Sequence, residues 1–384
     1  MIVREIEEKI ENLIFNQGKI IVLYGARQVG KTTLINKVLS HYKGKVLQIN
    51  ADEQVYNETL SSRNFSKLSG MVEGFDLLFI DEAQRIPDIG INLKILHDKL
   101  PELKIIVTGS SSLDLANRVN EPLTGRIITN SLYPISLLEW QNFKGLNDYS
   151  VVLNIEELLL YGMYPEIFSL GNYSEKRKYL DDLCKSYLFK DILSLSNIKY
   201  PEKLDQLLKI LAYQVGQLVS LNELSTALQI HREALMNYIS LFEKSFVIFR
   251  LSGYSRNLRK EIVKMDKIYF YDIGIRNAII NNFNSINLRN DKGQLWENFL
   301  ISERIKSNAY SEIYTNSYFW RTYTGAELDY IEEKDGQLYG YEFKWGNKKA
   351  KVPKSWTENY ENSIYECINE ENFMNWLRNE NKQI

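Results

Sequence analysis

Hydrophobic residues in the first third of the chain gather in five short runs, at residues 20–24, 45–50, 77–80, 104–108 and 127–132. Such runs are typical of strands that helices cover on both faces, as in a parallel sheet. Around the first run, apolar residues recur at helical spacing, at Ile6, Ile10, Leu34 and Val38 among others. The pattern predicts an α/β fold built on a parallel sheet.

The first run ends in a loop with the spacing of a phosphate-binding loop, G-x-x-x-x-G-K-T. Its residues are Gly25, Ala26, Arg27, Gln28, Val29, Gly30, Lys31, Thr32 and Thr33. The glycines let successive backbone N–H groups point at the phosphates of a nucleotide, and a helix that begins near Lys31 directs its positive end there. We expect Lys31 to reach the β and γ phosphates, and the Thr32 hydroxyl to bind Mg²⁺. The alternative is a glycine-rich turn that binds nothing.

Two later strands end in polar residues at the same edge of the expected sheet. The run at 77–80 is followed by Asp81 and Glu82, the Walker B pattern. We expect Asp81 to hold Mg²⁺ through water and Glu82 to orient the attacking water; alternatively the pair only caps the next helix. Thr108 and Ser110 follow the next strand, where they either sense the γ-phosphate or cap a helix.

Composition and charge narrow the class of protein. With 384 residues, 44% of them hydrophobic and 25% charged, the chain is expected to form two or three globular domains. It contains no apolar run of membrane-spanning length, and its first residues are charged, so we expect a cytoplasmic protein with no membrane partner. The net charge of −2 gives no overall attraction to nucleic acid, so any DNA binding needs a local patch.

The middle of the chain reads as helices. Apolar residues recur at helical spacing between residues 155 and 195, and residues 220–249 predict two helices joined by a short turn near Gln229. With β-like runs at 247–251 and 267–271, this is a helix-turn-helix pattern, with residues 232–241 as the helix for a DNA major groove. Basic residues between 256 and 267 are candidates for phosphate contacts. The alternative is a winged helix that only packs against its neighbours.

The last part of the chain brings together a second set of charged residues. A helix carries Glu297, and three strands follow at 318–321, 327–332 and 337–345, the last two joined by an Asp-Gly hairpin turn. Asp329 lies on the second strand. Glu342 and Lys344 share one face of the third, because side chains two residues apart point the same way.

These motifs resemble two known groups of proteins. GARQVGKTT, LLFIDEAQR, IVTGSSS, LTGR and LYPISLLEW resemble AAA-type P-loop ATPases of bacteria and archaea that carry a restriction-endonuclease-like C-terminal domain. Glu297, Asp329 and the Glu342-x-Lys344 pair resemble the PD-(D/E)xK nuclease core. That resemblance implies Mg²⁺ at Asp329 and Glu342, with Glu297 either as a direct ligand or as a support for the ligands. Lys344 would either orient the metal-bound water or neutralise the charge that develops on the phosphate. The alternative for Glu342 and Lys344 is an ion pair on the strand face.

The resemblance implies four parts: an ATPase core at 1–140, a helical lid at 141–200, a winged helix at 201–282 and a nuclease-like domain at 283–384. Arg126 is a candidate arginine finger that acts in trans in a homo-oligomer, and Arg118 is a second candidate; the alternative is an ordinary surface arginine. The resulting hypothesis is a Mg²⁺-dependent ATPase coupled to a nucleic-acid-directed winged-helix and nuclease-like module, with ATP as ligand and DNA as candidate partner. The alternative is an ATP-gated binding or recruitment switch whose nuclease-like domain is catalytically silent.

Overall fold

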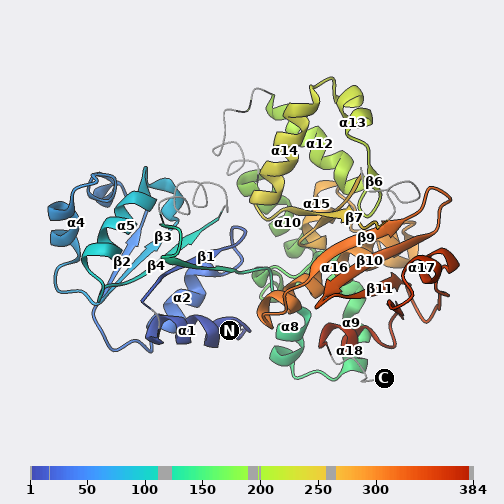
Figure 1. Cartoon of the computed structure of the whole chain (residues 1–384), viewed down its shortest axis with the longest axis horizontal. Helices are drawn as coiled ribbons and strands as arrows, with labels where there is room; N and C mark the ends of the chain where they lie inside the picture. The colour runs from blue at the N-terminus through green and yellow to red at the C-terminus, as the bar shows by residue number, and fades with distance from the viewer. Residues whose placement is uncertain are drawn as a thin grey trace. The chain divides into compact units, whose positions relative to one another are not determined.

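The computed structural model describes residues 2–16, 18–110, 123–188, 198, 200–256 and 265–379. The chain divides into two compact units (Figure 1). Unit 1 comprises Met1–Ile135 with Lys244–Phe246, and unit 2 comprises Ser136–Glu243 with Val247–Ile384. The four expected domain ranges are finer than this division and stay a prediction.

Unit 1 is built on the predicted parallel sheet, and each of the five apolar runs forms a strand. The strands are β1 (Ile20–Tyr24), β2 (Val46–Asn50), β3 (Leu77–Asp81), β4 (Lys104–Gly109) and β5 (Ile127–Ser131). All neighbours pair in parallel, in the order β2-β3-β4-β1-β5. Because β4 lies between β1 and β3, the end of β4 stands between the phosphate-binding loop and the Walker B residues.

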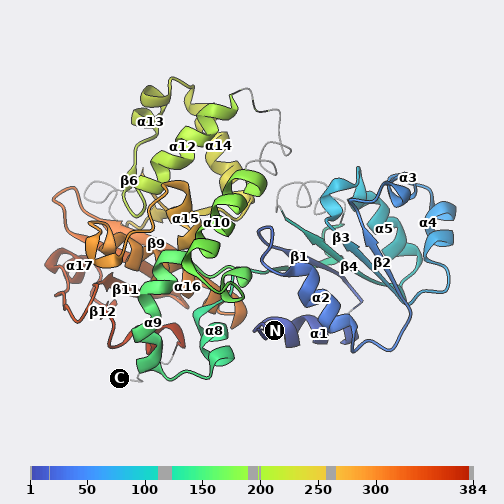
Figure 2. The same ribbon diagram turned by 180° about the vertical axis from the view of Figure 1, so that it is seen from behind.

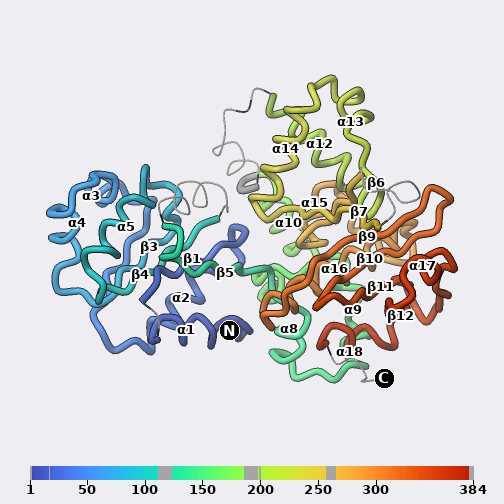
Figure 3. Tube along the Cα trace, in the orientation of Figure 1, coloured from blue at the N-terminus to red at the C-terminus, as the bar shows by residue number. Residues whose placement is uncertain are grey.

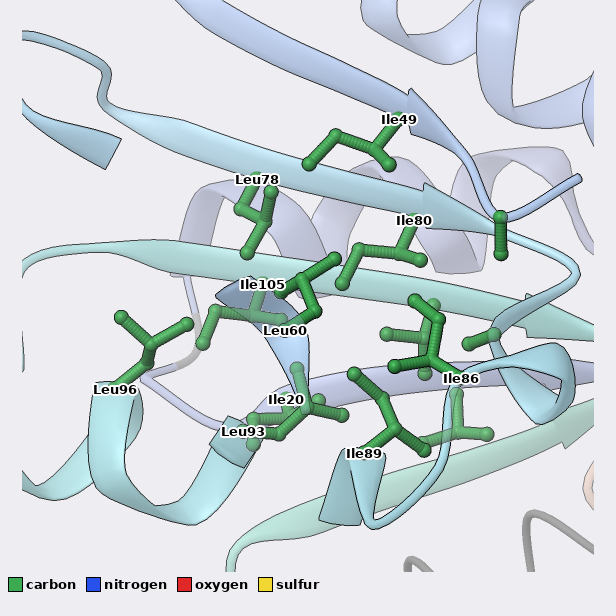
Figure 4. Packing of buried hydrophobic residues seen from close by; sticks show 14 of the residues in the cluster. Ile20, Ile49, Leu60, Leu78, Ile80, Ile86, Ile89, Leu93, Leu96 and Ile105 are labelled. Carbon is green, nitrogen blue, oxygen red and sulfur yellow. The ribbon is translucent and has the colours of Figure 1, made fainter. Parts of the chain in front are cut away.

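Helices cover this sheet and bury its apolar residues. The helical segments are α1 (Glu7–Asn16), α2 (Lys31–Leu39), η1 (Gln54–Tyr56), α3 (Asn57–Leu60), α4 (Phe65–Val72), η2 (Ala83–Arg85) and α5 (Ile89–Lys99). Figure 4 shows Ile89, Leu93 and Leu96 of α5 close to strand residues such as Leu78 and Ile105, in one buried cluster. Helices α1 and α2 lie beside each other (Figure 3), joined by an ion pair between Glu7 and Lys37. Every residue of β1 is buried, as expected for a central strand of a covered sheet.

Unit 2 contains one mixed sheet of seven strands, in the order β12-β11-β10-β9-β7-β8-β6. The strands are β6 (Leu218–Val219), β7 (Ile248–Gly253), β8 (Asp266–Phe270), β9 (Asn316–Arg321), β10 (Glu327–Lys334), β11 (Gln337–Phe343) and β12 (Ile364–Ile368). Pairs β7–β9 and β11–β12 are parallel, and the other pairs are antiparallel. The sheet therefore runs through both the expected winged-helix range and the expected nuclease-like range.

The helices of unit 2 surround this sheet. They are α8 (Leu137–Lys144), α9 (Asp148–Tyr161), η4 (Pro165–Phe168), α10 (Tyr173–Asp182), η5 (Leu183–Leu188), α12 (Pro201–Tyr213), α13 (Leu221–Leu228), α14 (Arg232–Lys244), α15 (Ile273–Ile279), η6 (Ile286–Leu288), α16 (Lys292–Tyr310), α17 (Lys354–Asn359) and α18 (Phe373–Leu377). Helices α12, α13 and α14 gather at one end of unit 2 (Figures 1 and 2). None of the helices in the described ranges combines the length and the apolar character that crossing a membrane requires.

One local feature in unit 2 follows directly from the sequence, and a second depends on a contact between distant residues. The Asp335-Gly336 turn joins β10 to β11, and both residues have positive φ angles, 51° and 78°, as a two-residue hairpin turn of type I′ requires. The helix α16 is largely buried although it carries charged residues. Its Arg304 makes two hydrogen bonds to the Glu332 carboxylate, at 2.8 and 2.7 Å, so that the buried charges are paired.

Candidate nucleotide-binding site and a second acidic pocket

The phosphate-binding loop lies between β1 and α2, and its shape depends on two glycines. Gly30, with φ of 96°, is in a region that L side chains rarely adopt, directly before the first residue of α2. Gly25 packs against the residue that follows β5: a Cβ there would lie 2.2 Å from the carbonyl oxygen of Leu132. Both positions therefore require glycine, one for its positive φ angle and the other for the close approach of a neighbouring backbone.

Lys31 is buried and turns back over the loop. Its Nζ donates hydrogen bonds to the carbonyl oxygens of Gly25 and Ala26, both at 3.0 Å, and lies 3.9 Å from Oε1 of Glu82. Sequence reasoning missed Arg4, which donates to the carbonyls of Val29, at 2.8 Å, and Tyr133, at 2.6 Å. One arginine near the amino terminus carries no signal in the sequence that would reveal this role in bracing the loop.

The residues expected to hold Mg²⁺ lie together at the ends of α2 and β3. The Thr32 hydroxyl donates a hydrogen bond of 2.7 Å to Oδ2 of Asp81, and the Thr108 hydroxyl donates to Oδ1 of the same carboxylate. Thr108 reaches Asp81 because β4 is the neighbour of β3. Hydroxyl and carboxylate oxygens are the ligands that Mg²⁺ prefers, so Thr32 and Asp81 fit the ion that the loop implies.

Glu82 lies at the turn that follows β3 and is held by a residue that sequence reasoning missed. Its carboxylate Oε2 accepts a hydrogen bond of 2.5 Å from Nε2 of Gln84, and the same amide nitrogen lies 2.9 Å from the Ser110 hydroxyl oxygen. The Glu82 backbone N–H donates to the Thr108 hydroxyl, at 3.3 Å. Gln84 acts here because the 3₁₀ turn η2 brings it back beside Glu82, a geometry that its place in the sequence alone does not specify. The helix that Ser110 was alternatively expected to cap lies outside the described residues.

Arg126 is paired within its own chain. It makes two hydrogen bonds to the Asp98 carboxylate, from Nε at 2.7 Å and from Nη2 at 3.1 Å, and these hold the pKa of Asp98 below its usual value. Its action in trans stays a prediction. Arg118, a second candidate for that role, lies outside the described residues.

The four residues predicted for the nuclease-like site line one pocket in unit 2, of about 870 Å³. Glu297 comes from α16, Asp329 from β10, and Glu342 and Lys344 from β11 and the residue that follows it. Asp329 Oδ2 accepts a hydrogen bond of 2.8 Å from the Phe343 N–H. Lys344 and Glu342 form the ion pair that was the alternative interpretation, with Nζ 2.5 Å from Oε1.

A lysine that sequence reasoning did not place here lies among these carboxylates. Lys267 of β8 is 2% exposed, and its Nζ lies 2.5 Å from Glu327 Oε1 and 3.3 Å from Glu297 Oε1. The Tyr269 hydroxyl also donates to Glu297 Oε1, at 2.5 Å. The sequence did contain a signal for this placement. Side chains two residues apart in a strand point to the same face, so Lys267 and Tyr269 share one face of β8. Lys267 is buried, so it is not available for the phosphate contacts expected of residues 256–267.

Burial shifts the titration of the acids in this pocket. It raises the pKa of Glu297 to about 7, and it also raises the pKa values of Asp329 and Glu342. Within the described part of the chain, no group of three or more His, Cys, Asp or Glu side chains is arranged to hold a metal ion. Glu297, Asp329 and Glu342 thus do not form such a group in this structure, and their predicted role in binding metal stays a prediction.

The predicted pair of helices is present at residues 221–244. Helices α13 and α14 are joined by a turn in which Gln229 has a φ of 54°, and β7 and β8 then pair in an antiparallel hairpin. Of the basic residues between 256 and 267, Arg256 stacks over the Tyr360 ring, while Arg259, Lys260 and Lys264 lie outside the described residues. DNA contact by this segment stays a prediction.

Comparisons with known proteins match three segments. Residues 17–141 match a family described as AAA domain, and residues 153–286 and 292–374 match two families described as domains of unknown function. An uncharacterized protein of Methanocaldococcus jannaschii is 26% identical over 355 residues, 87% of this chain and 77% of that protein. An uncharacterized protein of Mycobacterium tuberculosis is 28% identical over 337 residues, 86% of this chain and 71% of that protein.

Among solved structures, the Thermotoga maritima RuvB Holliday junction branch migration motor aligns at 16% identity with a TM-score of 0.32. The alignment covers 65% of this chain and 90% of that one. The match to the AAA domain family coincides with the parallel sheet and the phosphate-binding loop of unit 1. Together they support an AAA-type P-loop ATPase domain at residues 17–141.

Proposed function

We propose that this protein is a Mg²⁺-dependent ATPase whose reaction takes place at the phosphate-binding loop of unit 1. The observation that carries the proposal is the hydrogen bond between Thr32 and Asp81, which brings one residue from each half of the expected site together beside a buried lysine. A glycine-rich turn without a ligand would not need a hydroxyl, two acids and a lysine at one point. The match of residues 17–141 to an AAA domain supports the same assignment.

Each residue has a separate role in this proposal. The loop N–H groups and Lys31 bind the phosphates, which requires Lys31 to exchange its present carbonyl partners for phosphate oxygens. Thr32 and Asp81 would hold Mg²⁺, which supplies positive charge to the β and γ phosphates. Glu82 orients and polarises the attacking water, and Gln84 fixes the direction of the Glu82 carboxylate.

Two variants test the assignment. Lys31→Ala should lose nucleotide binding, because it removes the buried positive charge at the loop. Glu82→Gln should bind ATP but fail to turn it over, because an amide does not accept a proton from water. Lys37→Ala, on the same helix but in an ion pair with Glu7, is the matched control and should keep both activities.

The measurements are calorimetric binding of ATP with Mg²⁺ and release of inorganic phosphate. Turnover by Glu82→Gln at the rate of the unmodified protein would contradict the proposed role of Glu82. Absence of any ATP binding by the folded, unmodified chain would remove the proposal altogether. Chelation of Mg²⁺ should stop phosphate release in every variant that shows it.

We further propose that ATP binding or hydrolysis acts on a nucleic-acid-directed module in unit 2. Support comes from the helix pair α13 and α14 and the hairpin that follows, which are arranged in the order of a winged helix. The test is the rate of ATP turnover with a panel of double-stranded DNA, single-stranded DNA and RNA. Stimulation by one class supports the coupling and names the partner, whereas equal rates with all ligands and with none would contradict it.

The second candidate is an ATP-gated recruitment switch with a silent nuclease-like domain. The position of Lys267 among the acids of unit 2 favours it. Plasmid and single-stranded DNA are incubated with Mg²⁺ or Mn²⁺ beside the double variant Asp329→Ala, Glu342→Ala. Cleavage by the unmodified protein but not by the double variant would support a nuclease. Absence of cleavage by both proteins would support the switch.

A further inference from the structure

The pocket of unit 2 gathers four carboxylates from three elements: Glu297 of α16, Glu327 and Asp329 of β10, and Glu342 of β11. Four acids at one place repel one another and lose solvation when they are buried, so they require positive charge nearby. In a site of this composition a hard divalent cation is the usual source of that charge. Here the described residues supply it themselves.

Lys267 is the first internal source of positive charge. Its ammonium group contacts Glu327 at 2.5 Å and Glu297 at 3.3 Å, and its side chain is almost completely buried. Burial by itself lowers the pKa of Lys267, but the negative charges of Glu297, Asp329 and Glu327 outweigh burial and raise it. The ammonium group of Lys267 is therefore in direct contact with two of the four carboxylates.

Lys344 is the second source. Its Nζ lies 2.5 Å from Oε1 of Glu342, an acid that is not among the ion-pair partners of Lys267. Together the two ammonium groups bring the charge of one divalent ion. Other carboxylate oxygens also have partners: Asp329 accepts from the Phe343 N–H, Glu297 accepts from the Tyr269 hydroxyl, and Glu327 Oε2 lies 3.0 Å from Nη1 of Arg321.

The lysine is fixed in place by the sheet. Lys267 lies opposite Leu251 of β7 and opposite Leu218 of β6, so both neighbours of β8 hold its backbone. One residue beyond Tyr269, Phe270 exchanges two hydrogen bonds with the side chain of Asn298 on α16, at 2.7 and 2.8 Å. The sheet and α16 therefore hold the backbone of β8 at a fixed place beside the acids.

We propose that Lys267 replaces a divalent metal ion as the central counter-ion of the pocket, so that unit 2 of the native protein binds no catalytic metal there. The hairpin of the winged-helix range thereby neutralises the acids of the nuclease-like range. All residues of this pocket belong to unit 2, so the proposal does not depend on ATP hydrolysis in unit 1.

Binding of Mn²⁺ to the full chain without nucleotide tests the proposal. Measurements are made in a Lys31→Ala background, which excludes ions brought to unit 1 by nucleotide, and use electron paramagnetic resonance and thermal unfolding. The parent should show no Mn²⁺ binding, and no Mn²⁺-dependent shift of the unfolding temperature, that Asp329→Asn removes. Lys267→Met should unfold at a lower temperature and regain stability with Mn²⁺, with affinity more than about tenfold higher than that of the parent.

Three further variants separate the possible causes. Lys267→Arg keeps the positive charge and should bind no Mn²⁺. Adding Asp329→Asn to Lys267→Met should abolish the gained site, which places that site in the pocket. Lys292→Met, which removes another lysine that lines the pocket, is the matched control and should behave as the parent does.

Two results would overturn the proposal. The first is Mn²⁺ binding by the parent that Asp329→Asn removes, because the pocket would then take metal with Lys267 present. The second is a folded Lys267→Met variant that binds no Mn²⁺, because the lysine would then not be what excludes metal. If Lys267→Met does not fold, the parent and Lys267→Arg titrations decide the question by the first criterion.

Discussion

Substitution of Gly25 by alanine gives a direct test of how the loop is built. A Cβ at residue 25 would lie 2.2 Å from the Leu132 carbonyl oxygen, whereas ordinary contacts begin at 3.4 Å. The obstacle is backbone, and the Leu132 N–H is bonded to the Tyr24 carbonyl at 2.7 Å, so neither side can rotate away. The loop and the end of β5 must separate by about 1 Å, at a cost of roughly 1–3 kcal/mol.

Two measurements follow from that displacement. Chemical unfolding should show Gly25→Ala less stable by this amount, and saturating ATP should stabilise it less than it stabilises the parent protein. Ligand at about 100 times its dissociation constant adds about 2.7 kcal/mol, so loss of affinity appears as a smaller rise in unfolding temperature. The calorimetric dissociation constant for ATP measures the same loss directly.

Gly70→Ala in α4 is the matched control. A Cβ there meets nothing within 4 Å, and alanine in a helix interior is favoured over glycine by about 0.5–1 kcal/mol. This variant should be equally or more stable and bind ATP normally. If Gly25→Ala matched the parent in both stability and ATP affinity, the close packing of the loop against β5 would not be what shapes the site.

Two further predictions concern paired charges in unit 2. Glu332→Ala leaves Arg304 buried without its carboxylate partner, and urea unfolding should show a free energy of unfolding lower by about 3–5 kcal/mol. Glu243→Ala breaks the more exposed pair with Arg250 and should cost at most about 1 kcal/mol. Equal losses would contradict the idea that burial sets the cost of breaking each pair. Burial alone would raise the pKa of Asp291, but hydrogen bonds from two arginine side chains outweigh burial and lower this pKa to about 2. The ionised form of Asp291 therefore stabilises the fold above about pH 4, and this stabilisation is lost as the pH falls towards 2. Asp291→Asn should therefore be less stable than the parent by about 1–2 kcal/mol at pH 7, and this difference should shrink over that acid range; a difference that does not change with pH would contradict the assignment.

Local patterns were sufficient to predict much of this structure. The apolar runs predicted the three inner strands of unit 1, β1, β3 and β4, because burial on both faces leaves little room for polar residues. The runs of β2 and β5 include polar residues, because these strands lie at the edges of the sheet. The Asp335-Gly336 turn was predictable because few residue pairs adopt two successive positive φ angles. The pairing of Thr32 with Asp81 followed from the rule that parallel strands bring their carboxyl ends to one edge.

Contacts across long stretches of sequence were not predictable in this way. Arg4 reaches Tyr133 over 129 positions, and no spacing rule connects two such residues. Lys267 and Glu297 meet because β8 packs against α16, which depends on the order of strands in the sheet. Gln84 is close to Glu82 in sequence, but its role depends on the turn that brings its amide back to the carboxylate.

The seam between β7 and β9 has a mechanical consequence. Ser252 and Gly253 pair with Tyr318 and Phe319, and the Tyr254 N–H donates to the Phe319 carbonyl at 2.7 Å. A tilt of the β7–β8 hairpin is therefore transmitted to β9 through the hydrogen bonds between the backbones of β7 and β9. A fragment that ends before residue 283 would lack β9 and would expose the edge of β7, which would then be prone to self-association. The two halves of unit 2 therefore depend on each other to complete one sheet.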